Sequence, residues 1–449
     1  MFDSDGEKLD ATSEALHVLA YGQSAGVNKV IKTDRQGRLT LPYSVDNADR
    51  LRTSQPYTEL EMTHTLNHAD TTWSENIHYT VGASGTTIDN FYLTDSMVGL
   101  EVDTVDSYRR HSTKQKVIYH PGKSTLVKIT GCLNARSGGN DANCHTMIGL
   151  YDGNDGIFYE HNDTSGYVVV RRNGVDTKVV QDSWNLDTMD GNGGSGATID
   201  WTKTQYFVFD FQWQGVGNIN YSVLASGELI PVHTSLHANT TSGTFMKWGN
   251  LPIRYETSCN SITTSNNEMT MICATVISEG GGESIGHPHS AYAWKTGTSF
   301  GGDGNGAAIQ YHALSLRINP SHALSSSNIF FDGISSLVST KDYGVFVYYT
   351  PLQQTPPVAG VTWTDVSYSC MQYGTTSGGT KVAVDATNSI LVHSKWVSAE
   401  SASSLSNISE LAHFGTDITD TSSDILTIAI GGLGIGTAGG ATVDWHESI

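Results

Sequence analysis

The amino-acid sequence predicts an all-β protein in which an extended N-terminal arm precedes two antiparallel, jelly-roll-like β-sandwiches. Short segments of alternating apolar and polar residues recur at a spacing of roughly 8 to 12 residues, which is typical of antiparallel sandwiches. Helical periodicity is nearly absent, and the 47 glycines and 20 tyrosines favour tight turns and short strands. A chain of 449 residues also exceeds one typical core, so more than one domain is expected.

Residues 1–50 are predicted to form the extended arm. DSDGEKL (Asp3 to Leu9) and TDRQGRLTL (Thr33 to Leu41) each place an acidic turn with a glycine before a short apolar run, as β-hairpins do. The segment holds too few large apolar residues to build a core of its own. We therefore expect it to dock on other proteins by strand addition or by wrapping.

Residues 51–278 are predicted to form the first sandwich, of a jelly-roll-like or concanavalin-like kind. Its clearest alternation flanks a Gly-Val-Gly turn and comprises Phe207, Phe209, Phe211, Trp213, Ile219, Tyr221 and Val223. Each aromatic ring buries roughly 150–250 Å², so this hairpin is predicted to fill the space between two sheets and not to line a pocket. Asn173-Gly174, between two apolar runs, predicts a second hairpin with a two-residue turn.

Residues 279–290 (EGGGESIGHPHS) are predicted to form a glycine-rich joint, and residues 291–449 the second sandwich. The stretch TPPVAG at 355–360 is predicted to be a loop, because proline cannot donate a hydrogen bond within a central strand. Within SASSLSNISELAHF, at 401–414, the apolar residues have the spacing of a short amphipathic helix: Leu405, Ile408, Leu411 and Ala412.

The charge balance argues against two classes of partner. The 45 acidic and 25 basic residues give a formal charge of -20, which repels nucleic-acid phosphates and anionic lipid headgroups. No run of about 18 apolar residues occurs, so no membrane insertion is expected. The acidic, polar N-terminus does not resemble a signal peptide.

The five cysteines form an odd set without a Cys-x-x-Cys motif: Cys132, Cys144, Cys259, Cys273 and Cys370. Free, mostly buried thiols from a reducing compartment are expected. The alternative is a disulfide between Cys132 and Cys144, if these two residues flank one hairpin loop.

Two places carry residues that bind metals. Asp152 and Asp155 lie in DGNDG, a loop rich in oxygen donors of the kind that Ca²⁺ prefers, although tight turns use the same residues. His287 and His289 are two positions apart, so in a strand both imidazoles would face one transition metal. The neighbouring glycines and Pro288 favour a loop there instead. No bound cofactor is therefore expected, with Ca²⁺ or a histidine-bound metal as the alternatives.

A group of tryptophans beside Gly/Asn/Asp loops gives the candidate glycan-contacting residues, which are Trp184, Asn185, Asp187, Trp201 and Trp248. An aromatic face can stack on a sugar ring, and amides and carboxylates can bind its hydroxyl groups. The alternative is that these indoles plug the ends of the sandwich.

No set of residues points clearly to catalysis. Glu59 and Glu61 share a strand face, as the two acids of a glycosidase would, but an edge strand shows the same alternation. Asp210 lies opposite the aromatic face of its strand, where a solvated carboxylate is expected. The sequence contains no His-Glu-x-x-His motif and no phosphate-binding loop of the Walker type. The protein is therefore predicted not to be an enzyme.

Several runs within about residues 105–260 resemble virion structural proteins encoded by tailed bacteriophages and some large DNA viruses. The runs are YHPGKSTLVKITG from Tyr119, GLYDGNDGIFYE from Gly149, VVVRR from Val168, Trp184-Asn185-x-Asp187, Asp-x-x-x-x-Gln-x-Phe-x-x-Asp-Phe-x-Trp from Asp200 and LPIRYE from Leu251. A weaker likeness occurs at the C-terminus, in DILTIAI and VDWHE. The shared residues are mainly strand aromatics and turn residues, so the resemblance carries over no catalytic set.

The resemblance implies a setting in a virus particle assembled in the host cytoplasm. We expect a non-enzymatic virion structural protein, namely a tail-fibre, spike or receptor-binding component of a tailed virus. It would bind other virion proteins through its arm and a host-surface glycan through its loops. A homotrimer is expected because fibre and spike proteins of tailed phages are commonly trimers. Two alternatives stay open: a capsid-surface decoration or minor capsid protein, and a glycan-depolymerising enzyme on a β-sandwich.

Overall fold

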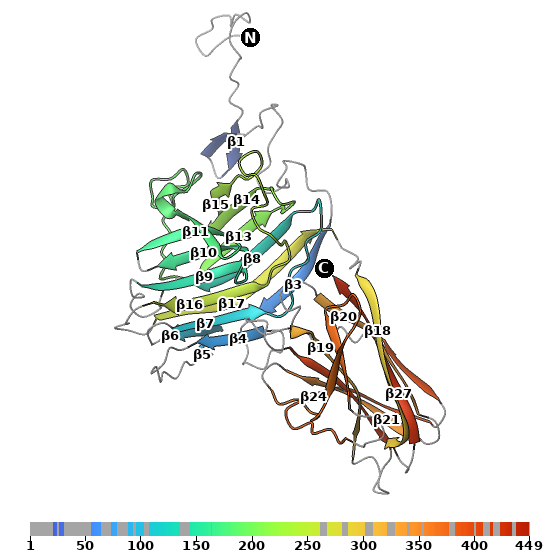
Figure 1. Ribbon diagram of the computed structural model, residues 1–449. Helices are drawn as coiled ribbons and strands as arrows, with labels where there is room; N and C mark the ends of the chain where they lie inside the picture. The colour runs from blue at the N-terminus through green and yellow to red at the C-terminus, as the bar shows by residue number, and fades with distance from the viewer. Residues whose placement is uncertain are drawn as a thin grey trace, which may run out of the picture. The chain divides into compact units, whose positions relative to one another are not determined.

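The computed structural model describes residues 21–24, 27–30, 55–63, 73–78, 89–92, 96–102, 107–134, 143–162, 164–260, 267–280, 286–300, 309–320, 328–338, 342–351, 354–376, 382–398, 401–406, 414–415, 423–432 and 437–448 (Figure 1). The chain divides into two compact units, Met1–Ser54 and Gln55–Ile449. In the first unit, β1 (Tyr21–Ser24) and β2 (Val27–Val30) pair as an antiparallel hairpin. Both turns predicted within the arm lie outside the described residues.

The predicted all-β, double-sandwich fold is confirmed. Within the described part of Gln55–Ile449, every strand pairing is antiparallel, and the one helical segment is a 3₁₀ turn at Gln181–Ser183. No described helix is long and apolar enough to cross a membrane. The helix predicted at 401–414 is wrong where it is described, because β25 (Ala402–Ser406) pairs with β20 (Asn328–Val338). An isolated helix of that length is marginal, whereas a strand gains hydrogen bonds from its neighbour.

Two sheets form the first sandwich, whose strands run from blue to yellow in Figure 1. The seven-stranded sheet has the order β12 (Val175–Val180), β11 (Ser165–Arg172), β10 (Gly156–Asn162), β9 (Cys144–Tyr151), β16 (Ile253–Cys259), β7 (Ser107–Thr113), β4 (Trp73–His78). The eight-stranded sheet has the order β15 (Glu228–Ser235), β14 (Ile219–Ala225), β13 (Gln205–Phe211), β8 (Thr125–Cys132), β17 (Asn267–Glu279), β6 (Met97–Val102), β5 (Asp89–Tyr92), with β3 (Pro56–Thr63) also paired to β17.

The hairpin of β13 and β14 fills the space between these sheets, as the sequence predicts. Phe207 and Phe209 are fully buried and pair across the hairpin with Val223 and Tyr221. Their rings belong to one core cluster with residues of the seven-stranded sheet. Because apolar side chains occupy this space, the aromatic face of β13 borders a packed core and no open cleft.

The turn at Asn173-Gly174 is also confirmed. It joins β11 to β12, and both residues have positive φ, 50° and 76°. A two-residue hairpin loop needs this left-handed conformation at both positions, which asparagine and glycine tolerate best. The local sequence therefore determines this connection.

The cysteine prediction is wrong for two of the five residues. Cys144 and Cys259 form a disulfide, whereas Cys132 is a buried thiol that donates to the carbonyl of Asn134. Cys144 begins β9 and lies opposite Cys259 at the end of β16. Cys132 and Cys144 do not flank a hairpin loop, because β8 and β9 belong to different sheets. The pairing depends on strands 115 residues apart, which local spacing does not reveal.

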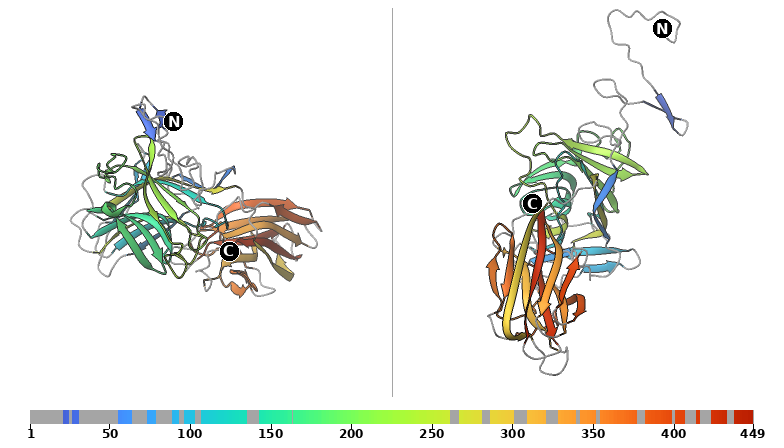
Figure 2. Two further views of the ribbon diagram at one scale, coloured as in Figure 1. Left: turned by 90° about the horizontal axis from the view of Figure 1, so that it is seen from above. Right: turned by 90° about the vertical axis from the view of Figure 1, so that its right-hand side faces the viewer.

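The second sandwich, yellow to red in Figure 2, also consists of two sheets. The four-stranded sheet has the order β18 (His287–Phe300), β27 (Thr437–Ser448), β20, β25, and the six-stranded sheet the order β22 (Thr362–Asp365), β23 (Met371–Thr375), β19 (Tyr311–Ile318), β26 (Ile425–Gly432), β21 (Tyr343–Thr350), β24 (Ile390–Val397). Its core includes the buried rings of Trp445, Tyr343 and Tyr349. The predicted loop at 355–360 lies outside the strands.

A buried ion pair joins elements of the two sandwiches. Lys114, which directly follows β7, places its Nζ 3.0 Å from Asp424 Oδ1 and 2.7 Å from the Tyr349 hydroxyl. Burial raises the pKa of Asp424, and the neighbouring Lys114 opposes that shift. A buried carboxylate needs such a partner, since removing it would leave an uncompensated charge.

We predict that Phe209→Ala lowers the free energy of unfolding by about 3–5 kcal/mol, because the substitution leaves a cavity in a closed core. The matched control is Leu224→Ala on β14 of the same hairpin, where the side chain is exposed. Urea unfolding followed by circular dichroism measures both. Equal losses in the two variants would show that the β13 aromatics do not hold the sheets together.

Candidate functional site

The outer face of the seven-stranded sheet carries a group of charged side chains that form ion pairs with one another. On β16, Ile253 and Tyr255 point into the core, so Arg254 and Glu256 point to the opposite face. The strand register places the following residues on the same outer side, here called the arginine face: Tyr108, Arg110, His145, Met147, Tyr151, Phe158, Glu160, Tyr167, Val169, Arg171, Arg254, Glu256, Asp176 and Lys178.

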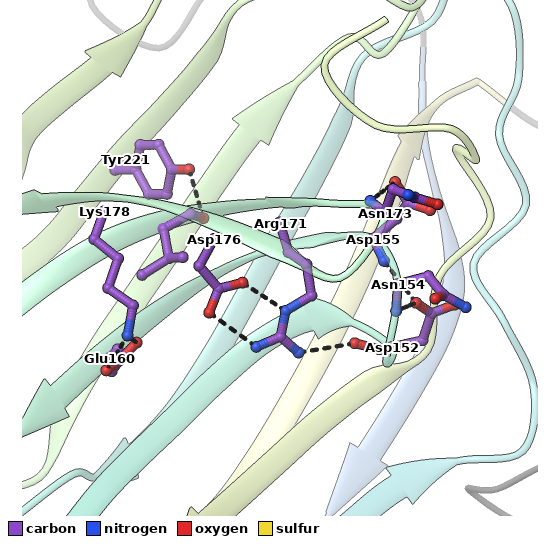
Figure 3. Close-up of polar contacts among 10 residues, drawn as sticks. Asp152, Asn154, Asp155, Glu160, Arg171, Asn173, Asp176, Lys178 and Tyr221 are labelled. Carbon is purple, nitrogen blue, oxygen red and sulfur yellow. Dashed lines mark hydrogen bonds and ion pairs between the residues drawn. The ribbon is translucent and has the colours of Figure 1, made fainter.

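Glu160 is held as a carboxylate on this face (Figure 3). It is 1% exposed, and Lys178 Nζ lies 2.6 Å from both of its oxygens. His145 Nδ1 lies 2.7 Å from Oε1. Burial alone would raise the pKa of Glu160, but the hydrogen bonds from His145 and Lys178 outweigh it and lower the pKa from 4.5. Glu160 is therefore a poor proton donor near neutral pH.

The other two carboxylates of the arginine face are also paired with cations. Arg171 donates from Nε and Nη2 to the two carboxylate oxygens of Asp176, at 2.6 and 3.1 Å (Figure 3). Arg110 Nε lies 2.8 Å from Glu256 Oε2. A glycosidase needs one protonated and one ionised carboxyl on either side of the scissile bond. These acids neutralise arginine and lysine instead.

At one end of this sheet, a turn at residues 152–155 fastens three loops together (Figure 3). Asp152 Oδ1 accepts hydrogen bonds from the backbone N–H groups of Asn154 and Asp155, at 2.7 and 2.8 Å. Asp155 Oδ1 accepts from the N–H of Asn173 at 3.5 Å and of Lys247 at 2.8 Å. Burial raises the pKa of Asp155. The Asp155 carboxylate thus anchors the loop that carries Lys247.

The predicted calcium ligands of this turn therefore have structural partners. Asp155 Oδ2 is buried without a hydrogen-bond partner, so this oxygen is still able to accept a proton or a cation. The described residues contain no group of three His, Cys, Asp or Glu side chains that could hold a metal ion. Ca²⁺ binding at Asp152 and Asp155 stays a prediction.

The His287 and His289 pair lies in a strand, and the loop expected there is wrong. Both residues belong to β18, whose described pairing is with β27 alone, so Pro288 lies in an edge strand, where proline is tolerated. His287 is exposed, whereas His289 stacks on Trp445 at 5.8 Å and lies 3.9 Å from Glu447. Metal binding by this pair stays a prediction.

Of the three candidate tryptophans, two are packed against the core. Trp184 is 4% exposed and donates from Nε1 to the carbonyl of Val179. Trp201 is half-buried and donates to Gln181 Oε1. A sugar could not stack on the Trp184 ring without rearrangement of the sandwich. Both indoles pack against the core cluster of the first sandwich, and glycan contact by Trp184 and Trp201 stays a prediction.

Asn185 and Asp187 stabilise backbone in the same region. Asn185 exchanges two hydrogen bonds with the backbone of Thr234, at 2.8 and 2.9 Å. Asp187 is buried and accepts from the N–H groups of Met189 and Ser195, at 2.8 and 2.7 Å. Trp248, by contrast, is 47% exposed and directly follows Lys247. Among the predicted glycan-contacting residues, Trp248 has the ring that a ligand can reach.

Cavities in the described structure lie outside the arginine face. A cavity of about 780 Å³ adjoins β18 and is lined by Tyr292, Trp294, Asp365 and Tyr373 among others. Tyr292 is 73% exposed and Trp294 is about half exposed. This volume is within the range of ligand pockets, and its rings could stack on a sugar.

A smaller cavity, of about 100 Å³, is lined by Glu59, His120 and Phe330 among others. Burial raises the pKa of Glu59 to about 7, and His120 Nε2 lies 3.0 Å from Glu59 Oε1. Glu59 is therefore a carboxyl group able to exchange a proton near neutral pH.

The segment Gly282-Glu283-Ser284-Ile285-Gly286 matches the Gly-x-Ser-x-Gly pattern of serine hydrolases. Residues 281–285 lie outside the described residues. The segment follows β17 and precedes β18, whereas the motif requires a turn from a strand into a helix. The match therefore gives no support for a nucleophile.

Comparisons with known proteins concern the fold. No family model matches the sequence, and no curated protein matches it significantly. Similar solved structures include lectin II from Ulex europaeus, with a TM-score of 0.30, 6% identity, and coverage of 49% of this chain and 99% of the lectin. An endo-β-1,4-glucuronan lyase from Trichoderma reesei has a TM-score of 0.29, 10% identity, and coverage of 49% of this chain and 95% of the lyase. The likeness is confined to architecture.

Sequence reasoning missed the arginine face, although the signal was present. In IRYETS, from Ile253, the alternation that buries Ile253 and Tyr255 also puts Arg254 and Glu256 together on the other side. Charged residues inside a strand with one buried face indicate a second, functional or paired surface. What local sequence does not show is that β7, β9, β10, β11 and β12 add their own charges to it.

We predict that Glu160→Gln lowers the free energy of unfolding at pH 7 by about 2 kcal/mol, because a buried charge-assisted pair is lost. The pKa of Glu160 is depressed in the folded state, so its stabilisation is present above pH 4.5 and is lost as the pH falls through the folded pKa. In urea titrations, the difference in the free energy of unfolding between wild type and Glu160→Gln should therefore shrink below pH 4.5. The control is Glu61→Gln, at an exposed residue, which should leave the free energy of unfolding unchanged at every pH. A difference between wild type and Glu160→Gln that does not depend on pH would contradict the conclusion that Glu160 is held as a carboxylate.

Proposed function

We propose that this chain is a non-enzymatic structural protein of a virus particle, of the tail-fibre or receptor-binding kind, that recognises a host-surface glycan. The virion setting rests on the sequence runs within residues 105–260 that resemble virion structural proteins. Docking of residues 1–50 onto other virion proteins and assembly as a homotrimer belong to the same proposal.

Glycan recognition is supported chiefly by one observation, the exposed indole of Trp248 on an anchored loop. The backbone of the preceding residue, Lys247, is held by Asp155, which also holds Asn173. An anchored aromatic ring loses little conformational freedom when a sugar stacks on it. Asp152 and Asp155 hold the backbone of Asn154 and Asn173 on the neighbouring turns (Figure 3), and Lys247 Nζ donates to Asn173 Oδ1. Side-chain amides of this kind are suited to the polar contacts that sugar recognition needs.

The absence of catalysis is supported by the carboxylates of the arginine face. Glu160, Glu256 and Asp176 are each within ion-pair distance of a basic side chain. The lowered pKa of Glu160 also makes it a poor proton donor near neutral pH. The face is thus suited to binding charged groups.

We predict that Trp248→Ala weakens glycan binding by about tenfold, because one aromatic stacking contact contributes roughly that much. A glycan array, followed by titration of the best ligand, measures the effect. Trp396→Ala, at an exposed tryptophan of β24, is the matched control and should bind normally.

The array experiment also locates the site. If Trp294→Ala abolishes binding and Trp248→Ala does not, glycan recognition holds but occurs in the cavity beside β18. If no glycan binds the wild-type protein, the receptor-binding proposal fails. Counting the copies in a purified particle separates a tail component, with a few dozen, from a capsid decoration, with hundreds.

A glycan-depolymerising enzyme is the second candidate, favoured by the Glu59 and His120 pair. The raised pKa of Glu59, about 7, is what a general acid requires. We expect no oligosaccharide to be released from host envelope by the purified protein, because the described structure shows no second carboxyl paired with Glu59 as a base. Release that Glu59→Gln abolishes, and Glu61→Gln does not, would establish the enzyme instead.

A further inference from the structure

A cavity of about 390 Å³ lies on the outer face of the six-stranded sheet in the second sandwich. On β19, Leu316 and Ile318 belong to the core, so Ser315 and Arg317 point to the opposite side. The cavity is lined by the stretch Thr355–Val361 and by Ser315, Arg317, Trp363 and Ile425. Its volume is within the range of pockets that bind small molecules.

The guanidinium of Arg317 is positioned by residues of the two neighbouring strands, β22 and β23. Its Cζ lies 4.2 Å from the centroid of the Trp363 ring, and its Nε donates to Gln372 Oε1 at 2.8 Å. The Trp363 ring in turn lies against Gly374, where an added Cβ would be 3.0 Å from two ring carbons. Stacking occupies the face of a guanidinium and leaves its in-plane N–H groups able to donate. The Arg317 fork is therefore held in place without a ligand.

Arg317 forms no ion pair with any described residue, and its Nη1 and Nη2 donate to none of them. Asp365, on the same face, accepts from Asn319 Nδ2 at 3.0 Å and from Gln372 Nε2 at 2.7 Å. Burial lowers the pKa of Arg317. For Arg110, burial acts in the same direction, but its carboxylate partner outweighs it and raises the pKa. Arg317 thus brings a positive charge to the cavity without a carboxylate beside it.

A ligand in the cavity can reach this charge. Arg317 and Trp363 are both partly exposed, and both line the cavity. The lining stretch is fixed, because the Asp385 N–H donates to the Pro357 carbonyl at 2.8 Å and proline restricts its own backbone. The apolar side chains that complete the lining are those of Pro356, Pro357, Val358, Ala359, Val361 and Ile425.

The combination of one cation and apolar walls selects among anions. A dianion such as phosphate would leave its hydration shell and gain a single cationic partner, which is unfavourable. A monoanion with an apolar body loses less hydration, and its body gains from leaving water. The chemistry of the cavity therefore favours a carboxylate attached to a hydrocarbon group.

We propose that this cavity binds a small carboxylate with an apolar body, such as an aromatic acid, through Nη1 and Nη2 of Arg317. A planar guanidinium binds the two oxygens of a carboxylate through parallel hydrogen bonds. The apolar body would lie against the proline-containing stretch and Ile425. The site belongs to the second sandwich, and glycan recognition at Trp248 does not depend on it.

The test is a calorimetric titration of the full chain with benzoate, with its neutral isostere benzamide and with acetate. We expect the wild type to prefer benzoate over benzamide by roughly tenfold, the size of one charge-assisted contact. Benzoate should also bind at least roughly tenfold more tightly than acetate, because acetate lacks the apolar body. Equal affinity for benzoate and benzamide would overturn the inference.

Substitution of Arg317 connects the preference to this cavity. Arg317→Met should abolish the preference for benzoate over benzamide. Arg172→Met, at an exposed arginine of β11, makes the same charge change in the first sandwich and should keep the preference. Arg317→Lys guards against misfolding of Arg317→Met, since it retains the charge but has no planar fork, and it should lose most of the preference. An unchanged preference in either Arg317 variant overturns the inference.

The remaining outcomes concern the kind of ligand. If the wild type binds none of the three probes, the small-carboxylate site fails, whereas the proposed glycan recognition is unaffected. A titration with a short peptide that ends in a free apolar residue completes the design. Binding of this peptide that depends on Arg317, without binding of benzoate, would overturn the assignment to a small molecule in favour of a peptide C-terminus.

Discussion

The first sandwich depends on a reciprocal contact between its two sheets. Tyr159 of the seven-stranded sheet packs against Phe207, Phe209 and Tyr221 of the other sheet, with centroid distances of 4.5 to 5.7 Å. Its hydroxyl donates to the Ser222 carbonyl, while the Tyr221 hydroxyl donates back to a carbonyl of β11. Each ring thus fills the core and satisfies a buried polar group across it. Because this contact closes the interior, recognition has to use the outer faces and the loops.

The sequence was a good guide to structure wherever neighbours in the chain are neighbours in space. The alternation of β13 and β14 predicts their hairpin and its buried face, and Asn173-Gly174 predicts a turn. The alternation that buries Leu60 and Met62 and leaves Glu61 exposed follows the same rule. Period-two patterning determines which face a residue occupies whenever one face of a strand is buried.

The sequence was a poor guide to features that depend on strands far apart in the chain. The disulfide of Cys144 and Cys259 exists because β9 and β16 are adjacent, and β25 is a strand because β20 lies beside it. The candidate site shows the same limit. Composition around Trp184 suggested a ligand contact, but tertiary packing buried the ring. The arginine face required five strand pairings to assemble. Such pairings follow from global packing, which outweighs local preference.

Amide hydrogen exchange followed by mass spectrometry tests most directly whether the aromatic contact closes the first sandwich. If it does, the peptides of β9, β10, β13 and β14 should exchange only through global unfolding, with protection equal to the free energy of unfolding from urea titration. Exchange of β13 and β14 at the rate of the exposed turn after β11, while the rest of the sheet stays protected, would contradict a closed core. It would show instead that the hairpin opens and that the interior is accessible to a ligand.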